Sequence, residues 1–234
     1  MRKLIHFFCF ALLSYTAVAQ TGKNPYNLPL INTLEAFNKE TAKDTNNEMI
    51  DLQYFIPHLV LDIRYANSQN FTNEIIYTDA KAFARRPVAH ALSKIQIALD
   101  SIGLALKIFD AYRPYQATLR FYEIYPDTNF VAAPWYGSRH NRGAAVDLTL
   151  IEKKTGLELQ MPTAYDDFSE AAAPTYQNLA ADVIKNRNLL IAIMDRYGFD
   201  VYESEWWHYD FIIWERFSLI DLSFEQLMPD KLKH

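Results

Sequence analysis

The sequence predicts a single-domain α+β fold. The chain has 234 residues, 50% of them hydrophobic, which is enough for one sizeable core. Helical and strand patterns follow one another without the regular β-α-β alternation of a doubly wound sheet. No G-x-G-x-x-G or phosphate-loop glycine pattern occurs in the sequence. A Rossmann-type sheet is therefore disfavoured.

The composition narrows the class of protein further. The 15 Tyr, 15 Phe and 4 Trp indicate a packed core and exclude a disordered chain. The formal net charge is −5 and no cluster of Lys and Arg stands out. Nucleic-acid binding needs a basic surface, so we expect no nucleic-acid partner.

The first nineteen residues have the pattern of a secretory signal peptide. Arg2 and Lys3 precede an apolar run over residues 4–15, and Ala-Val-Ala at 17–19 is a cleavage site. A membrane anchor is the alternative, but a bilayer span needs about 20 apolar residues. We therefore expect residues 1–19 to be removed, and the protein to be periplasmic or secreted with no membrane span.

The single cysteine, Cys9, lies within this apolar run. The mature chain therefore has no thiol, which excludes disulfides, cysteine-zinc sites and a cysteine nucleophile. Any metal must be bound by His, Asp or Glu.

Asn and Pro residues are scattered through residues 20–48. This composition predicts an extended leader or linker with little regular structure before a folded domain at 49–234.

The folded region begins with strand formers. Residues 59–65 predict an edge strand, because Pro57 interrupts the apolar pattern just before them. Apolar residues then recur at helical spacing between Pro87 and Gly103, which predicts an amphipathic helix that ends at that glycine. The elements expected after it are a strand at 104–110, a helix at 115–125, a strand through 146–150, a helix at 176–197 that stops at Gly198, and a strand at 199–214.

Two segments carry candidate metal ligands. His140 and Asp147 are seven residues apart, an offset that a straight strand would place on opposite faces. Residues 141–143 look like a turn, and Gly143 makes a chain reversal cheap, so the two side chains could converge. His208 from the second segment would complete a three-ligand site with an open position, as in catalytic zinc centres. Taken alone, His140 would more often be an ordinary buried or surface histidine.

Two further residues have the chemistry of a hydrolase. Glu205, three residues before His208, could take a proton from a metal-activated water, provided that a bulge or bend within 205–208 brings both to one face. Arg113 is a candidate cation for charge that develops on a substrate carbonyl. The alternatives are a solvated strand charge for Glu205 and a simple ion-pair partner for Arg113.

Other suggestive residues are more readily explained by packing. We expect His58 and His90 to be structural and at least one of Trp206 and Trp207 to lie in the core. The same interpretation applies to the aromatic group Phe121, Tyr122, Tyr125 and Phe130.

Three motifs resemble those of the D-alanyl-D-alanine dipeptidases. They are DAYRP at 110–114, SRHNRGAAVDLTL at 138–150 and EWWHY at 205–209, and the likeness extends over about residues 61–214. These zinc enzymes share a fold with D,D-carboxypeptidases and Hedgehog N-terminal domains. The resemblance implies a central, mainly antiparallel sheet flanked by helices.

The resemblance also implies a role for each matched residue. One zinc ion would be bound by His140, Asp147 and His208, Glu205 would be the general base, and Arg113 would stabilise the oxyanion. The residues implied in dipeptide binding are Ser138, Asp166 and Tyr65. The sequence departs from the family at Pro162, where the family has glycine, and in the loop 167–174.

The function expected from the resemblance is zinc-dependent hydrolysis of D-alanyl-D-alanine in peptidoglycan turnover. The partner would be this small dipeptide, and the sequence leaves the oligomeric state open. Two alternatives stay open. One is a D,D- or L,D-carboxypeptidase acting on peptidoglycan stem peptides, and the other is a noncatalytic, Hedgehog-like zinc module that binds the cell wall.

Overall fold

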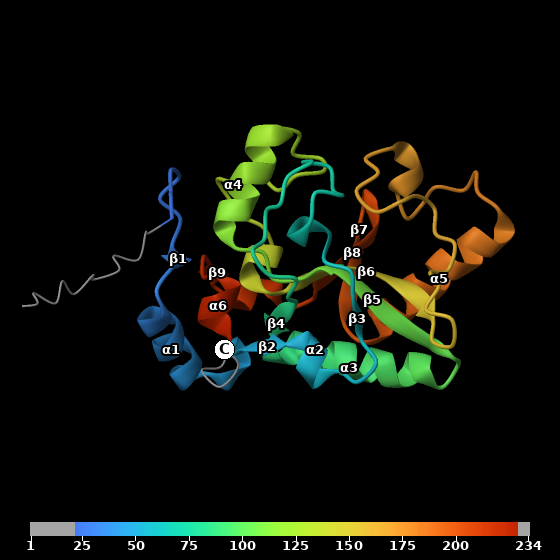
Figure 1. Cartoon of the computed structure of the whole chain (residues 1–234), viewed down its shortest axis with the longest axis horizontal. Helices are drawn as coiled ribbons and strands as arrows, with labels where there is room; N and C mark the ends of the chain where they lie inside the picture. Colours follow the sequence, from blue (N-terminus) through green and yellow to red (C-terminus); the bar gives the residue numbers. More distant parts are fainter. Residues whose placement is uncertain (1–21, 229–234) are drawn as a thin grey trace, which may run out of the picture.

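The computed structural model describes residues 22–228, and Figure 1 shows their arrangement. The predicted signal peptide and Cys9 lie outside the described residues. The helices are α1 (Leu34–Lys43), α2 (Leu52–Phe55), α3 (Arg86–Asp100), α4 (Tyr115–Ile124), α5 (Ala181–Arg196) and α6 (Phe224–Leu227). The strands are β1 (Leu30–Ile31), β2 (Met49–Asp51), β3 (Val60–Leu61), β4 (Phe83–Arg85), β5 (Leu104–Asp110), β6 (Ala145–Glu152), β7 (Phe199–Tyr202), β8 (Glu205–Phe211) and β9 (Leu219–Ile220).

A five-stranded sheet forms the centre of the molecule, in the order β3-β5-β6-β8-β7. Only the pair β3 and β5 is parallel, and the other neighbours are antiparallel. β6 is buried on both faces from its first residue to its seventh, as expected for a central strand. α3 packs against β5, and α5 packs against β7 and β8. The predicted α+β class, with a mainly antiparallel sheet flanked by helices, is confirmed.

Several predicted elements match the structure closely. β5 has the predicted bounds, and α4 ends one residue before the predicted limit. Pro87 lies in the first turn of α3, and Gly103 follows the helix with a φ of +76°. The two helices were predictable because their sequences contain both the helical periodicity and the residues that start or stop a helix. The strand β5 was predictable because it is a short apolar run that follows the stop at Gly103.

Three predicted elements differ from the structure. The strand at 59–65 is reduced to β3, because the chain turns into a short 3-10 helix at Arg64–Ala66. The helix at 176–197 begins only at Ala181. The strand at 199–214 is a hairpin of β7 and β8, because the polar residues Glu203 and Ser204 turn the chain between two apolar stretches.

The expectation of little regular structure at 20–48 is wrong. β1 pairs in parallel with β9, with Leu30 opposite Leu219. α1 follows, and Thr33 caps it by accepting a hydrogen bond from the backbone N–H of Ala36 at 3.2 Å. Phe37 of this helix is buried in the core. The partner strand comes from the other end of the chain, so local composition could not reveal this pairing.

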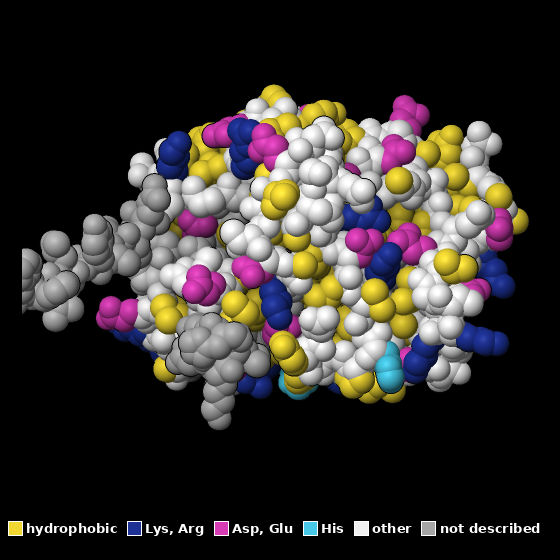
Figure 2. All heavy atoms as spheres, in the orientation of Figure 1, with side chains coloured by type: hydrophobic (Ala, Val, Ile, Leu, Met, Phe, Trp, Pro, Cys, Tyr) yellow, Lys and Arg dark blue, Asp and Glu magenta, His cyan; other side chains and the backbone are white. Residues whose placement is uncertain are grey.

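The surface visible in Figure 2 intersperses acidic and basic side chains among apolar ones. Within residues 22–228, no helix is both long enough and apolar enough to cross a membrane.

Candidate active site

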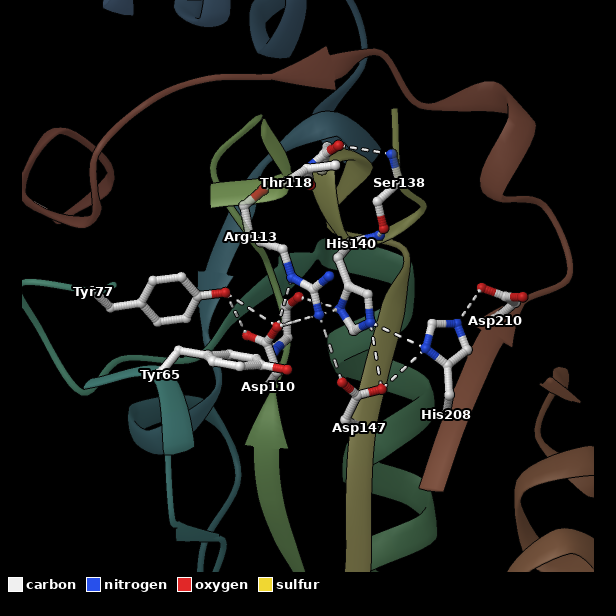
Figure 3. Close-up of polar contacts among 12 residues, drawn as sticks. Tyr65, Tyr77, Asp110, Arg113, Thr118, Ser138, His140, Asp147, His208 and Asp210 are labelled. Atoms are coloured by element: carbon white, nitrogen blue, oxygen red, sulfur yellow. Dashed lines mark hydrogen bonds and ion pairs between the residues drawn. The ribbon is translucent and has the colours of Figure 1, made fainter. Parts of the chain in front are cut away.

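Three neighbouring strands place charged side chains in one row across the central sheet. Asp110 ends β5 and lies opposite Asp147 of β6, which in turn lies opposite His208 of β8. Directly opposed residues in a sheet point to the same face, so the strand register alone gathers these three side chains. Figure 3 shows them along one line, with His140 above Asp147.

His140 reaches this row through the predicted chain reversal. It begins a 3-10 turn (His140–Arg142) that ends at Gly143, whose φ of +66° is in the left-handed region. A Cβ at Gly143 would lie 2.7 Å from the end of the Met49 side chain, which would have to move, so the positive φ is the stricter reason for glycine here. His140 Nδ1 lies 2.6 Å from the carbonyl oxygen of Ala111, which orients the ring.

The ring nitrogens and one carboxylate oxygen converge on a single point. His140 Nε2 lies 3.1 Å from His208 Nδ1, and Asp147 Oδ1 lies 3.0 Å from His208 Nδ1 and 3.4 Å from His140 Nε2. Asp147 Oδ1 is buried and accepts no hydrogen bond of acceptable geometry. The carbonyl of Ala111 can only accept, so the proton of a neutral His140 is on Nδ1 and Nε2 presents a lone pair.

The same reasoning applies to His208. Its Nε2 lies 3.0 Å from Asp210 Oδ1, so the proton of a neutral His208 is on Nε2 and its Nδ1 also presents a lone pair. Three lone pairs that face one another at this distance repel unless a proton or a metal cation lies between them. A tetrahedral zinc with bonds of about 2.0–2.1 Å places its ligand atoms roughly 3.3 Å apart, which these separations match. His140, Asp147 and His208 therefore fit a zinc ion, as predicted for this cluster.

Each of these three residues is also held on its far side. Tyr165 donates a hydrogen bond from its hydroxyl to Asp147 Oδ2 at 2.9 Å, which leaves Oδ1 for the metal. Asp210 holds His208, and the Ala111 carbonyl holds His140. Sequence reasoning missed Tyr165 and Asp210. Asp210 could have been found, because residues two apart on a strand share a face.

Glu205 lies beside the cluster, at the bulge that was predicted. β7 pairs Val201 with Tyr209 and then Tyr202 with Glu205, so β8 contains extra residues between these pairs. Glu205 Oε2 is 3.8 Å from His208 Nδ1. Burial raises the pKa of Glu205 to about 8. A carboxyl group with a pKa near neutrality suits proton transfer.

Arg113 is buried next to the metal ligands and is held by Asp110. Its Nε donates to Asp110 Oδ2 at 2.9 Å, and its Nη2 lies 2.8 Å from the same oxygen and 3.8 Å from Asp147 Oδ2. Nη1 has no hydrogen-bond partner among residues 22–228, so it can donate to a ligand. Arg113 is thus both an ion-pair partner, as the alternative interpretation held, and a cation in the cavity that the cluster lines.

The three predicted dipeptide-binding residues line that cavity, which has a volume of about 470 Å³. The Tyr65 hydroxyl lies 3.1 Å from both carboxylate oxygens of Asp166, and Ser138 Oγ accepts a hydrogen bond from the backbone N–H of His140. Burial, together with the negative charges of Asp147 and Glu205, raises the pKa of Asp166 well above its usual value. A positively charged ligand group would be stabilised here.

The residues assigned to packing divide between the core and the cavity. Trp206 and Trp207 are both buried, as expected of at least one of them, and Trp207 also lines the cavity. Phe121 is buried but also lines it, as does Phe130, so packing is not their only contact. His90 packs edge-on against the Phe55 ring and is not part of the metal cluster.

A metal site made of two histidines and an aspartate, with a buried glutamate and an arginine beside it, defines a metal-dependent hydrolase. The chain belongs to the D-ala-D-ala dipeptidase family, Peptidase_M15, which matches residues 45–216. The protein is accordingly a zinc metallopeptidase.

Individual relatives agree with this family. A D-alanyl-D-alanine dipeptidase of Escherichia coli (strain K12) is 35% identical over 163 residues, covering 70% of this chain and 84% of the relative. An Enterococcus faecalis protein of the same name is 30% identical over 171 residues, covering 64% and 85%. Among solved structures, the vancomycin resistance D,D-pentapeptidase VanY in complex with Zn(II) is 17% identical, with a TM-score of 0.35, covering 57% of this chain and 75% of that one.

Proposed function

We propose that this protein hydrolyses the dipeptide D-alanyl-D-alanine to two D-alanines, with zinc bound by His140, Asp147 and His208. The observation that carries the proposal is the convergence of one possible ligand atom each from His140, Asp147 and His208 beside the buried carboxyl group of Glu205. The names of the relatives supply the substrate, since both are D-alanyl-D-alanine dipeptidases.

The residues of the chain divide the chemistry between them. When bound, zinc polarises the scissile carbonyl and acidifies a water molecule. Glu205 takes the proton of the attacking water and passes it to the nitrogen of the leaving D-alanine. Arg113 donates from Nη1 to the oxygen on which negative charge develops, and Asp110 keeps the guanidinium in place.

The remaining residues of the cavity orient the dipeptide. Asp166 binds the free amino group of the substrate, which restores a charge partner to a carboxyl group that is otherwise crowded by Asp147 and Glu205. Tyr65 fixes Asp166 through its hydroxyl, and Ser138 binds the peptide from the loop that precedes the His140–Arg142 turn.

A second candidate function follows from the size of the cavity. Besides the metal cluster, its lining includes Phe71, Phe130, Tyr136 and Trp214. A volume of about 470 Å³ exceeds what a dipeptide of two alanines fills. A D,D- or L,D-carboxypeptidase that trims stem peptides would use this additional space. A noncatalytic zinc module explains neither the buried base nor the buried arginine.

Product analysis by mass spectrometry tests the proposal. The purified protein with zinc is given D-Ala-D-Ala, L-Ala-L-Ala and a stem pentapeptide that ends in D-Ala-D-Ala. Cleavage of D-Ala-D-Ala alone is the expected result. Release of D-alanine from the pentapeptide alone would replace the proposal with the carboxypeptidase function, and zinc binding without turnover of any peptide would favour the binding module.

We further propose that the protein is exported and acts in peptidoglycan turnover. The support is the signal-type pattern of residues 1–19, with its two basic residues, apolar run and Ala-Val-Ala site. N-terminal sequencing of the protein from an extracytoplasmic fraction should give a chain that begins at Gln20. Recovery of the intact chain from the cytoplasm would contradict export.

A further inference from the structure

The imidazole of His208 is connected to an acid-base pair outside the metal cluster. His208 Nε2 lies 3.0 Å from Asp210 Oδ1, and Arg139 Nη1 lies 3.0 Å from Asp210 Oδ2. Each carboxylate oxygen of Asp210 therefore has its own partner. Figure 3 shows Asp210 on the side of His208 that faces away from Asp147.

The strand geometry explains how this arrangement arises. His208 and Asp210 are two residues apart on β8, so their side chains lie on the same face. The backbone of Asp210 is fixed between two strands, because it pairs with Ala145 of β6 and with Asp200 of β7. Its side chain therefore starts from a rigid position, and only 8% of the residue is exposed.

Arg139 closes the chain of contacts from a different segment. It immediately precedes His140 in the turn that delivers the other histidine. Its guanidinium carbon lies 4.9 Å from the centre of the Trp214 ring and 5.8 Å from that of Tyr202, so two aromatic rings restrict the guanidinium. It is the only arginine or lysine whose ion pair with Asp210 is seen among residues 22–228.

We infer that Asp210 and Arg139 are positioning residues, which fix the tautomer and orientation of His208 so that Nδ1 points at the metal. This inference rests on the proposed zinc site. A carboxylate can only accept a hydrogen bond, so Asp210 keeps the proton of His208 on Nε2 and keeps Nδ1 free to bind. Arg139 holds the second oxygen and so prevents the carboxylate from rotating away.

The two histidines differ in how they are held. His140 is oriented by a neutral backbone carbonyl, that of Ala111. His208 is oriented by an ionised side chain that is itself anchored by a cation. An anionic partner makes an imidazole a stronger metal ligand, and loss of such a partner typically weakens metal affinity by about 10- to 100-fold. Zinc affinity should therefore depend on two side chains that do not touch the metal.

The test measures zinc affinity directly, by competition with a chromophoric chelator, on the purified full chain. We expect D210N to raise the zinc dissociation constant by about tenfold or more and R139Q to raise it by a smaller factor. R139K, which keeps the positive charge, should recover most of the loss caused by R139Q. The cobalt-substituted protein should show a shifted visible absorption band in D210N and R139Q.

The matched control is D200N. Asp200 lies directly opposite Asp210 on β7 and is exposed, so D200N removes the same charge from the same part of the sheet without touching His208. It should leave zinc affinity and the cobalt spectrum unchanged.

The inference is overturned if D210N and R139Q both bind zinc as tightly as the unsubstituted protein and have its cobalt spectrum. If D210N does not fold, R139Q and R139K decide the matter, because Arg139 is partly exposed. If the unsubstituted protein itself binds no zinc, the proposed function fails instead, so the two failures are distinguishable.

Discussion

Asp147 and Glu205 are two buried carboxyl groups that both lie close to His208 Nδ1, and their surroundings give them different protonation behaviour. Although burial opposes it, the imidazoles of His140 and His208, where they carry a proton, hold the pKa of Asp147 well below its usual value, so it stays ionised. Burial raises the pKa of Glu205 to about 8, and no ion pair with lysine or arginine is seen for it among residues 22–228. Pairs of acids with opposed pKa shifts are typical of a ligand and a proton carrier.

The first prediction concerns Glu205. Glu205→Gln keeps the size of the side chain but cannot accept a proton, so kcat should fall by about 10²- to 10⁴-fold. Zinc content, measured by mass spectrometry of the native protein, should be unchanged because Glu205 is not a ligand.

Glu203→Gln is the control for this substitution. Glu203 lies two residues earlier in the hairpin turn and is exposed, so it should keep the activity of the unsubstituted protein. Full activity of Glu205→Gln would show that Glu205 is not the general base.

The site could be predicted only to the extent that its residues stand close together in sequence or in a recognisable motif. His140, Asp147, His208, Glu205 and Arg113 were all named from the sequence, and the structure brings them to one cavity. Tyr165 was not found, because nothing local connects a tyrosine in an irregular loop with a carboxylate 18 residues earlier. Strand register and the fold of that loop create this contact.

Among the secondary-structure elements, the 3-10 turn at His140–Arg142 has the strictest requirement for its sequence. It must reverse the chain between a loop and β6 and also place the His140 side chain beside Asp147 and His208. Gly143 permits this with its positive φ and its lack of a side chain against Met49.

The second prediction separates these two roles of glycine. Gly156 has a similar φ of +73°, but a Cβ there would meet nothing within 4 Å. Gly156→Ala should therefore lower the free energy of unfolding by about 1 kcal/mol, from backbone strain alone. Gly143→Ala has the same backbone strain and also forces the end of the buried Met49 side chain to move, so it should cost about 2 kcal/mol, with reduced zinc affinity.

Denaturant unfolding of the two variants checks this prediction. Equal losses of stability would mean that Met49 moves aside without cost and that only the φ angle matters.

The secondary-structure elements that could be predicted are those whose causes lie in their own residues, and those that could not depend on distant contacts. α3 and β5 were predicted well because their own residues contain the periodicity and the stop signals. β1 has only two residues, and its partner β9 lies almost 190 positions away, so its existence depends on a contact that no local window contains.

For the molecule as a whole, Arg85 joins segments from the beginning, middle and end of the described chain. Its guanidinium donates to the carbonyl oxygens of Asn47, Arg142 and Ser218 and pairs with Glu40 at 3.3 Å. It is fully buried, and burial lowers its pKa to about 10.

The third prediction follows from this burial. Arg85→Met would leave three carbonyl groups and a carboxylate without their partner, and should lower the free energy of unfolding by about 3 kcal/mol or more. Arg86→Met is the neighbouring control. Arg86 pairs with Glu48 where both side chains are about one-third exposed, so its loss should cost under about 1 kcal/mol. Similar unfolding midpoints for the two variants would contradict the role given to Arg85.

The fourth prediction concerns metal removal. Zinc at about 100 times its dissociation constant stabilises the folded state by about 2.7 kcal/mol, so stripping it with a chelator should lower Tm by roughly 5 °C or more and abolish activity. Both should return with added zinc. Magnesium, which prefers oxygen ligands, should restore neither. If neither Tm nor activity changed on addition of the chelator, the metal would be neither stabilising nor catalytic, and the prediction would be wrong.

The pairing of β1 with β9 also has a consequence for the order of folding. Leu30 and Leu219 enclose nearly the whole described chain between them, and closing so large a loop becomes favourable only after the intervening sheet has shortened it. We therefore expect this contact to form late and to open first when the protein is destabilised. In hydrogen-exchange experiments, the backbone amides of β1 and β9 should lose their protection in low denaturant together, well before those of β5 and β6.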